Sequence, residues 1–226
     1  MKKENYKNRL LTSIFLIFLL YLCFNYLYIL IISLILISLF SWIEFTGLVS
    51  RIFINKGIKS SLFKIIIQAI SLIYLTIFSG IVFTGIYQHD FKLNMLFLIC
   101  ICIFSDIGGL IFGKFFKGKK LTKISPNKTI SGTIGSFVSS LLLVPVFYFF
   151  LDDGIDNLSN LIVIAILVSL VCQLGDLLIS YLKRKAKVKD TGNLLPGHGG
   201  ILDRIDGILF AVPIGVIFCE SLIVVI

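Results

Sequence analysis

Charged residues are scarce in this chain, and their scarcity excludes a soluble globular domain. Only 15% of the 226 residues are charged and 58% are hydrophobic, whereas soluble domains are about 45–50% apolar. Acidic residues are the rarer kind, with 12 against 21 Lys and Arg. A basic soluble protein would suggest a nucleic acid partner. Here the basic residues border long apolar runs, so we expect a membrane protein with no nucleic acid partner.

The patterns by which Cys and His bind metals are also missing. The five Cys all lie inside apolar runs, and none forms a CxxC or Cys/His spacing with its neighbours. Such spacings mark zinc sites and disulfide frameworks. We therefore interpret the cysteines as small apolar residues of the core or of the lipid-facing surface.

Long apolar runs make up most of the chain. No charged residue separates Arg9 from Glu44, and a helix needs about 20 apolar residues to span a bilayer. We predict an all-α polytopic membrane protein of about seven transmembrane helices, with a turn at Asn25. The predicted segments are Leu10–Phe24, Tyr26–Leu48, Leu62–Tyr87, Leu93–Phe112, Thr133–Leu151, Leu161–Leu182 and Ile205–Ile226.

The basic residues predict the direction of insertion. With the N-terminus in the cytoplasm and seven alternating helices, 20 of the 21 Lys and Arg fall on the cytoplasmic side, and only Lys92 falls outside. Cytoplasmic loops collect basic residues, and these also attract anionic lipids. We expect N-terminal transmembrane helices in residues 1–92 and a catalytic transmembrane region in 93–226. The latter carries two cytoplasmic polar loops, and both parts form one continuous membrane domain.

The densest polar stretch runs from Gly175 to Asp206. Asp176, Ser180 and Lys183 have a spacing that puts them on one helical face. A carboxylate within a membrane helix costs about 2.5–3.5 kcal/mol or more, so Asp176 must face a cation, a partner or water. The alternative is an Asp–Lys or Asp–Arg pair that only holds helices together.

Two further acids, Asp203 and Asp206, begin the last apolar segment. They could simply suit the positive end of a helix. However, Pro196–Gly200 (PGHGG) lies just upstream, and its glycines allow a ligand to approach the backbone closely. Carboxylates hold Mg²⁺, and Mg²⁺ holds phosphate oxygens. Acids, glycines and basic residues together therefore predict metal-assisted phosphate chemistry.

A second polar cluster combines Asp106, Gly113-Lys114 and Ser125-Pro126-Asn127-Lys128. Ser125-Pro126-Asn127 could be an ordinary turn before a helix. Because the predicted topology puts this cluster on the same side of the membrane as Asp176, we expect one shared site. Glu44, next to Trp42, is interpreted as an interfacial residue.

The order of these residues closely resembles a known signature. Its elements are Ser180, Lys183-Arg184, Lys189-Asp190, Pro196–Gly200, Asp203-Arg204 and Asp206. This pattern is similar to the signature of phosphatidate cytidylyltransferases, also called CDP-diacylglycerol synthases. The resemblance covers roughly Asp106 to Asp206, and the N-terminal half resembles the family only in hydropathy. The chain departs from the family at Ser131, where an acid is common, and at Leu110, where an aromatic residue is common.

The resemblance implies the roles of individual residues. It implies CTP and phosphatidate as substrates and Mg²⁺ as cofactor, with a second monovalent or divalent cation left open. It also implies that Asp176 and Asp203 hold the metal, and we add Asp206 from its position. We expect catalytic roles for Asp176, Asp203, Lys183, Arg184, Lys189, Asp190, His198 and Arg204. Substrate binding is expected of Asp106, Ser125, Asn127, Lys128, Ser180, Gly197, Gly199 and Gly200.

Other functions remain open from the sequence. Within the enzymes, the alternatives are a cytidylyltransferase acting on another lipid phosphate and a CTP-dependent lipid kinase. Outside the enzymes, they are a secondary transporter and a structural or lipid-binding membrane protein. We expect membrane lipids as partners, and a homodimer stays open. The expected location is the inner membrane of a bacterium, with the active site facing the cytoplasm.

Overall fold

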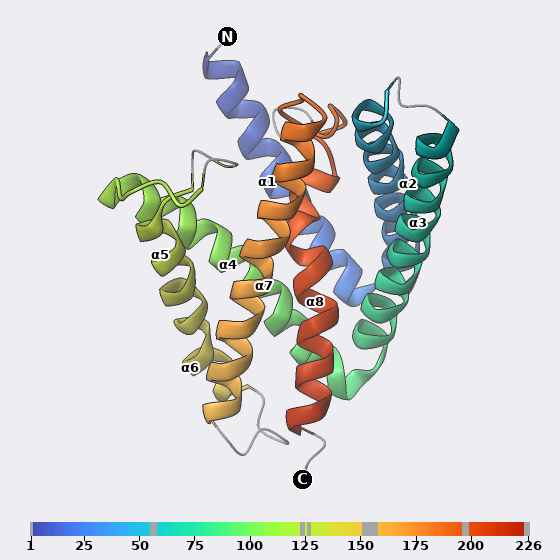
Figure 1. Ribbon diagram of the computed structural model, residues 1–226. Coiled ribbons are helices and arrows are strands. Elements are labelled where there is room, and N and C mark those ends of the chain that lie inside the picture. The colour runs from blue at the N-terminus through green and yellow to red at the C-terminus, as the bar shows by residue number, and fades with distance from the viewer. Residues whose placement is uncertain are drawn as a thin grey trace. The chain divides into compact units, whose positions relative to one another are not determined.

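The computed structural model describes residues 2–54, 58–122, 125, 128–150, 158–195 and 199–223. Within these ranges the chain is helical and contains no extended strand; only two isolated bridges pair Lys120 with Thr129 and Leu195 with Gly199. The all-α prediction is therefore confirmed (Figure 1). The elements are α1 (Lys2–Asn25), α2 (Leu27–Ile52), α3 (Ile58–Tyr87), the 3₁₀ turn η1 (His89–Phe91), α4 (Lys92–Phe116), α5 (Ile130–Leu141), α6 (Leu143–Tyr148), α7 (Leu158–Lys185) and α8 (Leu202–Ile223).

Within the described residues, five stretches are long and apolar enough to cross a membrane. They are Leu27–Ile52, Ser60–Tyr87, His89–Phe116, Ile130–Tyr148 and Leu158–Lys185, and the apolar part of α1, Leu10–Asn25, is shorter. Large apolar side chains such as Ile66 and Ile73 of α3 are more than half exposed, which suits a lipid environment and not water. The prediction of a polytopic membrane protein is confirmed at this level. The count of seven spans and the cytoplasmic N-terminus stay predictions.

Helix ends follow from local sequence. The predicted turn at Asn25 is confirmed, because α1 ends there and Tyr26 is extended, with φ −127° and ψ 112°. The single apolar segment predicted at Thr133–Leu151 is instead divided into α5 and α6 at Leu142. Helix α5 begins with a local cap, since Thr129 Oγ1 accepts a hydrogen bond from the Gly132 N–H at 3.1 Å. Such a cap satisfies one of the donors that the first turn leaves unpaired.

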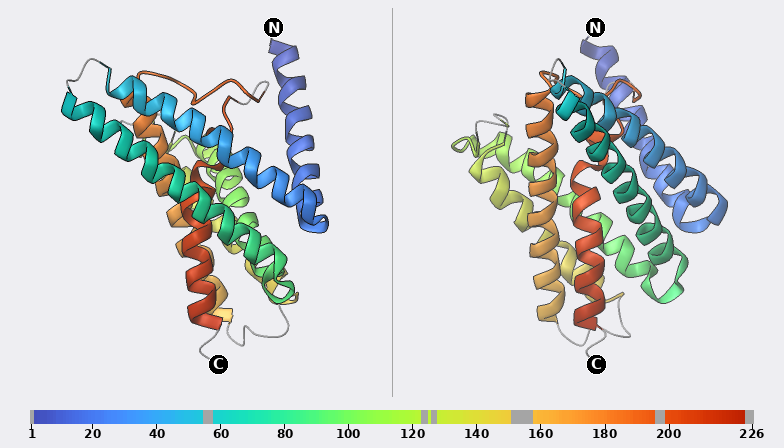
Figure 2. Two further views of the ribbon diagram at one scale, coloured as in Figure 1. Left: turned by 90° about the vertical axis from the view of Figure 1, so that its right-hand side faces the viewer. Right: turned by 45° about the vertical axis from the view of Figure 1, so that its right-hand side comes forward.

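The chain divides into two compact units, and α7 and α8 each contribute to both. The first unit comprises Met1–Phe83 and Leu182–Ile205, and the second comprises Thr84–Tyr181 and Asp206–Ile226. In the first unit α2 and α3 lie side by side, as both figures show (Figure 2). Polar contacts join them: Ser38 Oγ lies 2.6 Å from Ser79 Oγ, and Trp42 Nε1 donates to the Gln68 carbonyl at 3.1 Å.

In the second unit, glycines let helices approach at backbone distance. A Cβ on Gly108 of α4 would lie 2.6 Å from the Gly135 carbonyl oxygen of α5, and one on Gly132 would lie 2.8 Å from the Gly109 carbonyl oxygen. Small residues at such positions are the usual means of packing membrane helices. Buried serines add hydrogen bonds between α4, α5 and α7: Ser105 Oγ lies 2.9 Å from Ser169 Oγ, and Ser136 Oγ donates to the Ser105 carbonyl at 2.7 Å.

Helices α7 and α8 approach equally closely within this unit. A Cβ on Gly175 would lie 2.8 Å from the Asp206 carbonyl oxygen, and one on Gly207 would lie 2.9 Å from the Cys172 carbonyl oxygen. These contacts position Asp176 of α7 and Asp206 of α8 within the second unit.

Candidate active site

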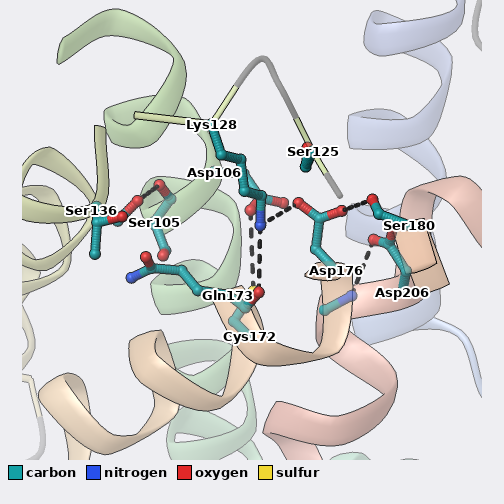
Figure 3. Close-up of polar contacts among 12 residues, drawn as sticks. Ser105, Asp106, Ser125, Lys128, Ser136, Cys172, Gln173, Asp176, Ser180 and Asp206 are labelled. Carbon is teal, nitrogen blue, oxygen red and sulfur yellow. Dashed lines mark hydrogen bonds and ion pairs between the residues drawn. The ribbon is translucent and has the colours of Figure 1, made fainter. Parts of the chain in front are cut away.

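In the second unit, a lysine from the loop before α5 meets an acid on α7 (Figure 3). Lys128 Nζ lies 2.6 Å from Asp176 Oδ2 and also donates to the Gln173 carbonyl at 3.2 Å. Ser180, one turn further along α7, donates to Asp176 Oδ1 at 3.2 Å. About a quarter of each charged side chain is exposed, 24% for Lys128 and 28% for Asp176. The structure thus brings together residues from both polar clusters of the sequence.

Two more predicted acids belong to the same unit. Asp106 of α4 is exposed, and its Oδ1 lies 4.0 Å from the Cys172 sulfur of α7. Asp206 of α8 is only 7% exposed, and its Oδ1 accepts a hydrogen bond from the Gly207 N–H at 2.9 Å. Figure 3 shows Asp106, Lys128, Asp176 and Asp206 in one close-up, on three helices and a loop. Of these three acids, Asp176 is paired with the Lys128 ammonium.

In the first unit, Asp203 at the start of α8 is surrounded by donors. Lys183 Nζ lies 2.7 Å from Asp203 Oδ1. The opposite oxygen, Oδ2, accepts from the Thr191 N–H at 2.8 Å, the Thr191 hydroxyl at 3.0 Å and the Gly200 N–H at 3.1 Å. Burial raises the pKa of this carboxyl, but the hydrogen bonds and the Lys183 charge outweigh it, so the pKa lies below its usual value. The Asp203 carboxyl group is therefore ionised at neutral pH.

Helix α7 ends just after Lys183, in a turn with a left-handed residue. The Val188 N–H donates to the Lys183 carbonyl at 3.0 Å, and the Lys187 N–H donates to the Arg184 carbonyl at 3.1 Å. Lys187 adopts a left-handed conformation with φ 56°. This is the Schellman arrangement, which usually has glycine at that position. It ends the helix sharply and turns the chain into the segment that surrounds Asp203.

A second left-handed residue, Gly199, lies in the glycine-rich segment. Its φ is +87°, and a Cβ there would lie 3.1 Å from Asp203 Oδ2 and 3.3 Å from Asp190 Cβ. Two backbone hydrogen bonds pair Gly199 with Leu195, at 2.9 and 3.2 Å. Glycine is required here on both conformational and steric grounds.

The remaining predicted residues are distributed as follows. Arg184, Lys189, Asp190 and Arg204 are exposed. The Ser125 carbonyl accepts from the Lys128 N–H at 3.1 Å, and the Ser125 N–H donates to Thr122 Oγ1 at 3.2 Å. Three predicted residues lie outside the described part of the chain: Asn127, Gly197 and His198.

Sequence reasoning missed two residues of the first unit, Thr191 and Glu44. Thr191 binds Asp203 through both its N–H and its hydroxyl, and nothing in its type or spacing marked it. Glu44 of α2 is 6% exposed and accepts three hydrogen bonds from residues 191–202. Its interpretation as an interfacial residue is wrong. A lone acid inside an apolar segment was the available signal, because such residues are usually functional.

The carboxylates of Asp176 and Asp203 are the type of ligand that Mg²⁺ takes. Mg²⁺ is held by one or two carboxylates together with substrate phosphates, and the Lys128 ammonium already places a positive charge against Asp176. Across the described ranges no three Asp, Glu, His or Cys side chains form a ready-made metal cluster. Asp176 and Asp203 belong to different units, so the ion that they are predicted to share stays a prediction.

Comparison with known proteins adds independent evidence. A family model described as the cytidylyltransferase family matches residues 1–222. A phosphatidate cytidylyltransferase of Staphylococcus haemolyticus is 44% identical over 121 residues, which are 53% of this chain and 46% of that protein. Proteins of the same name match from Bacillus subtilis, 44% over 125 residues (54% of this chain, 46% of the relative), and from Rickettsia felis, 44% over 128 residues (54% and 56%). The matched stretch thus spans about half the length of these curated relatives.

Proposed function

Since this chain belongs to the cytidylyltransferase family, we propose that it is a phosphatidate cytidylyltransferase of phospholipid biosynthesis. It would convert CTP and phosphatidate into CDP-diacylglycerol and pyrophosphate. The observation that carries the proposal is that the two acids expected to hold the metal each lie against a lysine ammonium, Asp176 at 2.6 Å and Asp203 at 2.7 Å. Paired acids and lysines of this kind suit the phosphate chemistry that the names of the relatives specify.

The proposed reaction is a displacement at phosphorus. An oxygen of the phosphatidate phosphate attacks the α-phosphorus of CTP and forms a new P–O bond. The bond from the α-phosphorus to the oxygen bridging to the β-phosphorus breaks, and pyrophosphate leaves with that electron pair. A phosphate monoester is already anionic near pH 7, so no strong general base is needed. Positioning and charge neutralisation are then the main tasks of the protein.

The chain's basic residues would carry out the neutralisation. Arg184, Lys189 and Arg204 are exposed, and we assign them to the phosphates of CTP and phosphatidate. Lys128 and Lys183 are held in place by their acids, so their ammonium groups are oriented before substrate arrives. Preorganised cations stabilise developing charge more effectively than mobile ones. Glycines 197, 199 and 200 would allow the triphosphate to approach the backbone.

Magnesium completes the proposed site. The residues that would hold it are Asp176, Asp203 and Asp206, with a second monovalent or divalent cation left open. Bound Mg²⁺ supplies positive charge to the phosphate oxygens of CTP and of pyrophosphate. The ligand set that we propose is one or two of these carboxylates together with phosphate oxygens.

The site is proposed to face the cytoplasm from the inner membrane of a bacterium. Helices suited to a membrane and bacterial relatives support an integral membrane protein. The basic residues of the loops support the orientation, because such residues collect on the cytoplasmic side. CTP would then reach the site from solution and phosphatidate from the membrane.

The decisive experiment supplies radiolabelled CTP to the purified protein with a panel of lipid phosphates. We expect label in a lipid product with phosphatidate, together with released pyrophosphate. Label in the lipid only with another acceptor would identify a different cytidylyltransferase. Transfer of the γ-phosphate would identify a lipid kinase. CTP with no transfer to any lipid phosphate would refute the proposed enzyme.

A further inference from the structure

A buried carboxylate on α2 holds the segment that surrounds Asp203. Glu44 is 6% exposed. Its Oε1 accepts from the Ile201 N–H at 3.0 Å, and its Oε2 accepts from the Leu202 N–H at 2.9 Å and from the Thr191 hydroxyl at 2.7 Å. All of these residues belong to the first unit. Glu44 thus binds both ends of a segment that lies more than a hundred residues away in sequence.

The contact acts as a cap for α8. Leu202 is the first residue of that helix, and the N–H groups of a first helical turn have no partner within the helix. A nearby Ser, Thr, Asp or Asn normally accepts from them. Here a glutamate from another helix does so, and its charge also suits the positive end of the α8 dipole. The donors that contact Glu44 in the described part of the chain are two backbone N–H groups and the Thr191 hydroxyl.

Two glycines show how closely the segment packs on Glu44. A Cβ on Gly192 would lie 2.5 Å from Glu44 Oε1, and a Cβ on Gly200 would collide with Glu44 Oε2 and with the Thr191 hydroxyl. A side chain at either position would therefore displace the Glu44 carboxylate from the place where it accepts its hydrogen bonds. The second glycine of Gly199-Gly200 is therefore explained by Glu44, and the first by its own backbone and Asp203.

Thr191 connects Glu44 to the proposed catalytic acid. Its hydroxyl lies 2.7 Å from Glu44 Oε2 and 3.0 Å from Asp203 Oδ2. A hydroxyl has one proton and donates to one of the two oxygens at a time, while the Thr191 N–H donates to Asp203 in either case. The Thr191 hydroxyl therefore lies within hydrogen-bonding distance of both carboxylates.

We infer that Glu44 is a positioning residue, which holds Thr191 and the start of α8 and through Thr191 sets the orientation of Asp203. This inference rests on the proposed function in one respect: Asp203 must belong to the site of nucleotidyl transfer. The hydrogen bonds of Glu44 to Thr191, Ile201 and Leu202 do not depend on which reaction the protein catalyses. Glu44 touches no substrate in this scheme, and its effect on turnover passes through Thr191 and Asp203.

The test uses the full chain in detergent and two separate measurements. Glu44→Gln keeps the side-chain volume but replaces one acceptor oxygen with an NH₂ group that faces backbone donors. We expect faster hydrogen–deuterium exchange at the amides of Ile201 and Leu202, by about tenfold or more, the loss expected for a hydrogen bond to a charged group. The matched control is Ser41→Ala, because Ser41 is fully buried on the same helix and its hydroxyl has no hydrogen-bond partner among the described residues.

Turnover distinguishes positioning from simple stabilisation. Thr191→Val should lower kcat by about tenfold, while Thr191→Ser, which keeps the hydroxyl, should restore it. KM for CTP should change less than kcat, since the Asp203 orientation and not the phosphate contacts is altered. Wild-type exchange in Glu44→Gln, or wild-type kcat in Thr191→Val, would overturn the inference. If the wild-type protein itself transfers no cytidylyl group while Glu44→Gln still speeds exchange, the proposed function fails and the holding role stands.

Discussion

Lys183 Nζ lies 2.7 Å from Asp203 Oδ1, and both side chains are largely shielded from solvent, with exposed fractions of 12% and 5%. The pair connects the last turn of α7 to the first turn of α8. Asp203 Oδ2 also accepts from the Thr191 and Gly200 N–H groups, and the Thr191 hydroxyl lies 3.0 Å from it. Loss of one partner of such a pair leaves the other charge shielded and uncompensated, which is more harmful than loss of an exposed pair.

Lys183→Met should therefore destabilise the protein by about 3–5 kcal/mol, the range for removing one partner of a shielded ion pair. Chemical unfolding in detergent measures this change. The control is Lys185→Met, because Lys185 is exposed in the same turn and exposed substitutions change stability by about 0.5 kcal/mol or less. The double variant Lys183→Met with Asp203→Asn should lose less than the sum of the single losses. Strict additivity would show that the two side chains do not interact.

Stability at acid pH should depend on Asp203. Its folded pKa is lowered, because the donors outweigh burial, so the unfolded chain binds this proton more readily. Its contribution is full above the ordinary carboxyl pKa, about 3.9, and is lost as the pH falls through that value towards the folded pKa. In metal-free buffer, Asp203→Asn should show a shallower loss of unfolding free energy between about pH 6 and pH 3. An unchanged acid slope would contradict the lowered pKa.

Asp176→Asn should abolish turnover while the protein still inserts into the membrane. The amide keeps the size of the side chain but lacks the charge that holds Lys128 and is proposed to bind metal. We expect a loss of at least about 100-fold in the rate of CDP-diacylglycerol formation, as for other removed charge-stabilising groups. Asp90→Asn is the control, because Asp90 is fully exposed on η1. Equal rates in the wild type and Asp176→Asn would exclude Asp176 from the site.

Removal of divalent metal should stop the reaction. EDTA should abolish product formation and added Mg²⁺ should restore it, since charge on CTP and pyrophosphate must be neutralised. Asp206→Asn should raise the Mg²⁺ concentration needed for half-maximal rate if Asp206 is a ligand. Monovalent salt at matched ionic strength is the control for screening. Full activity in EDTA would rule out the metal.

Much of the fold was predictable, because the hydropathy of the sequence indicates where its long apolar helices lie. Apolar runs gave the helices, and Asn25 marked the break between α1 and α2. The signal for the break at Leu142 is Pro145 in the first turn of α6, because proline lacks the N–H that a continuous helix would need there. Hydropathy alone does not show the break, since the apolar run continues through it. Close packing through Gly108 and Gly132 also depends on which faces meet, and residue spacing alone does not determine that.

The residues of the candidate site were predictable where their charge and their spacing in the sequence both indicated a role. Asp176 was expected from its charge in an apolar helix, and Lys128 and Asp203 from the polar clusters that contain them. The structure pairs each with a counter-charge. Which lysine pairs with which acid depends on tertiary contacts between distant segments. Glu44 was missed for the same reason, because its donors lie more than 140 residues further along the chain.

The packing of α4 on α5 gives a last prediction, on stability alone. Gly108→Ala would place a Cβ 2.6 Å from the Gly135 carbonyl oxygen, which the rigid backbone cannot avoid without moving the helices apart. Overpacking of this kind costs about 1–3 kcal/mol. Gly47→Ala is the matched control, because nothing lies within 4 Å of its added Cβ and Gly47 lies inside α2, five residues before the helix ends. There the alanine should instead stabilise the helix by about 0.5–1 kcal/mol. Thermal unfolding in detergent should therefore shift in opposite directions for the two variants, and a shift in the same direction would contradict the close contact between α4 and α5.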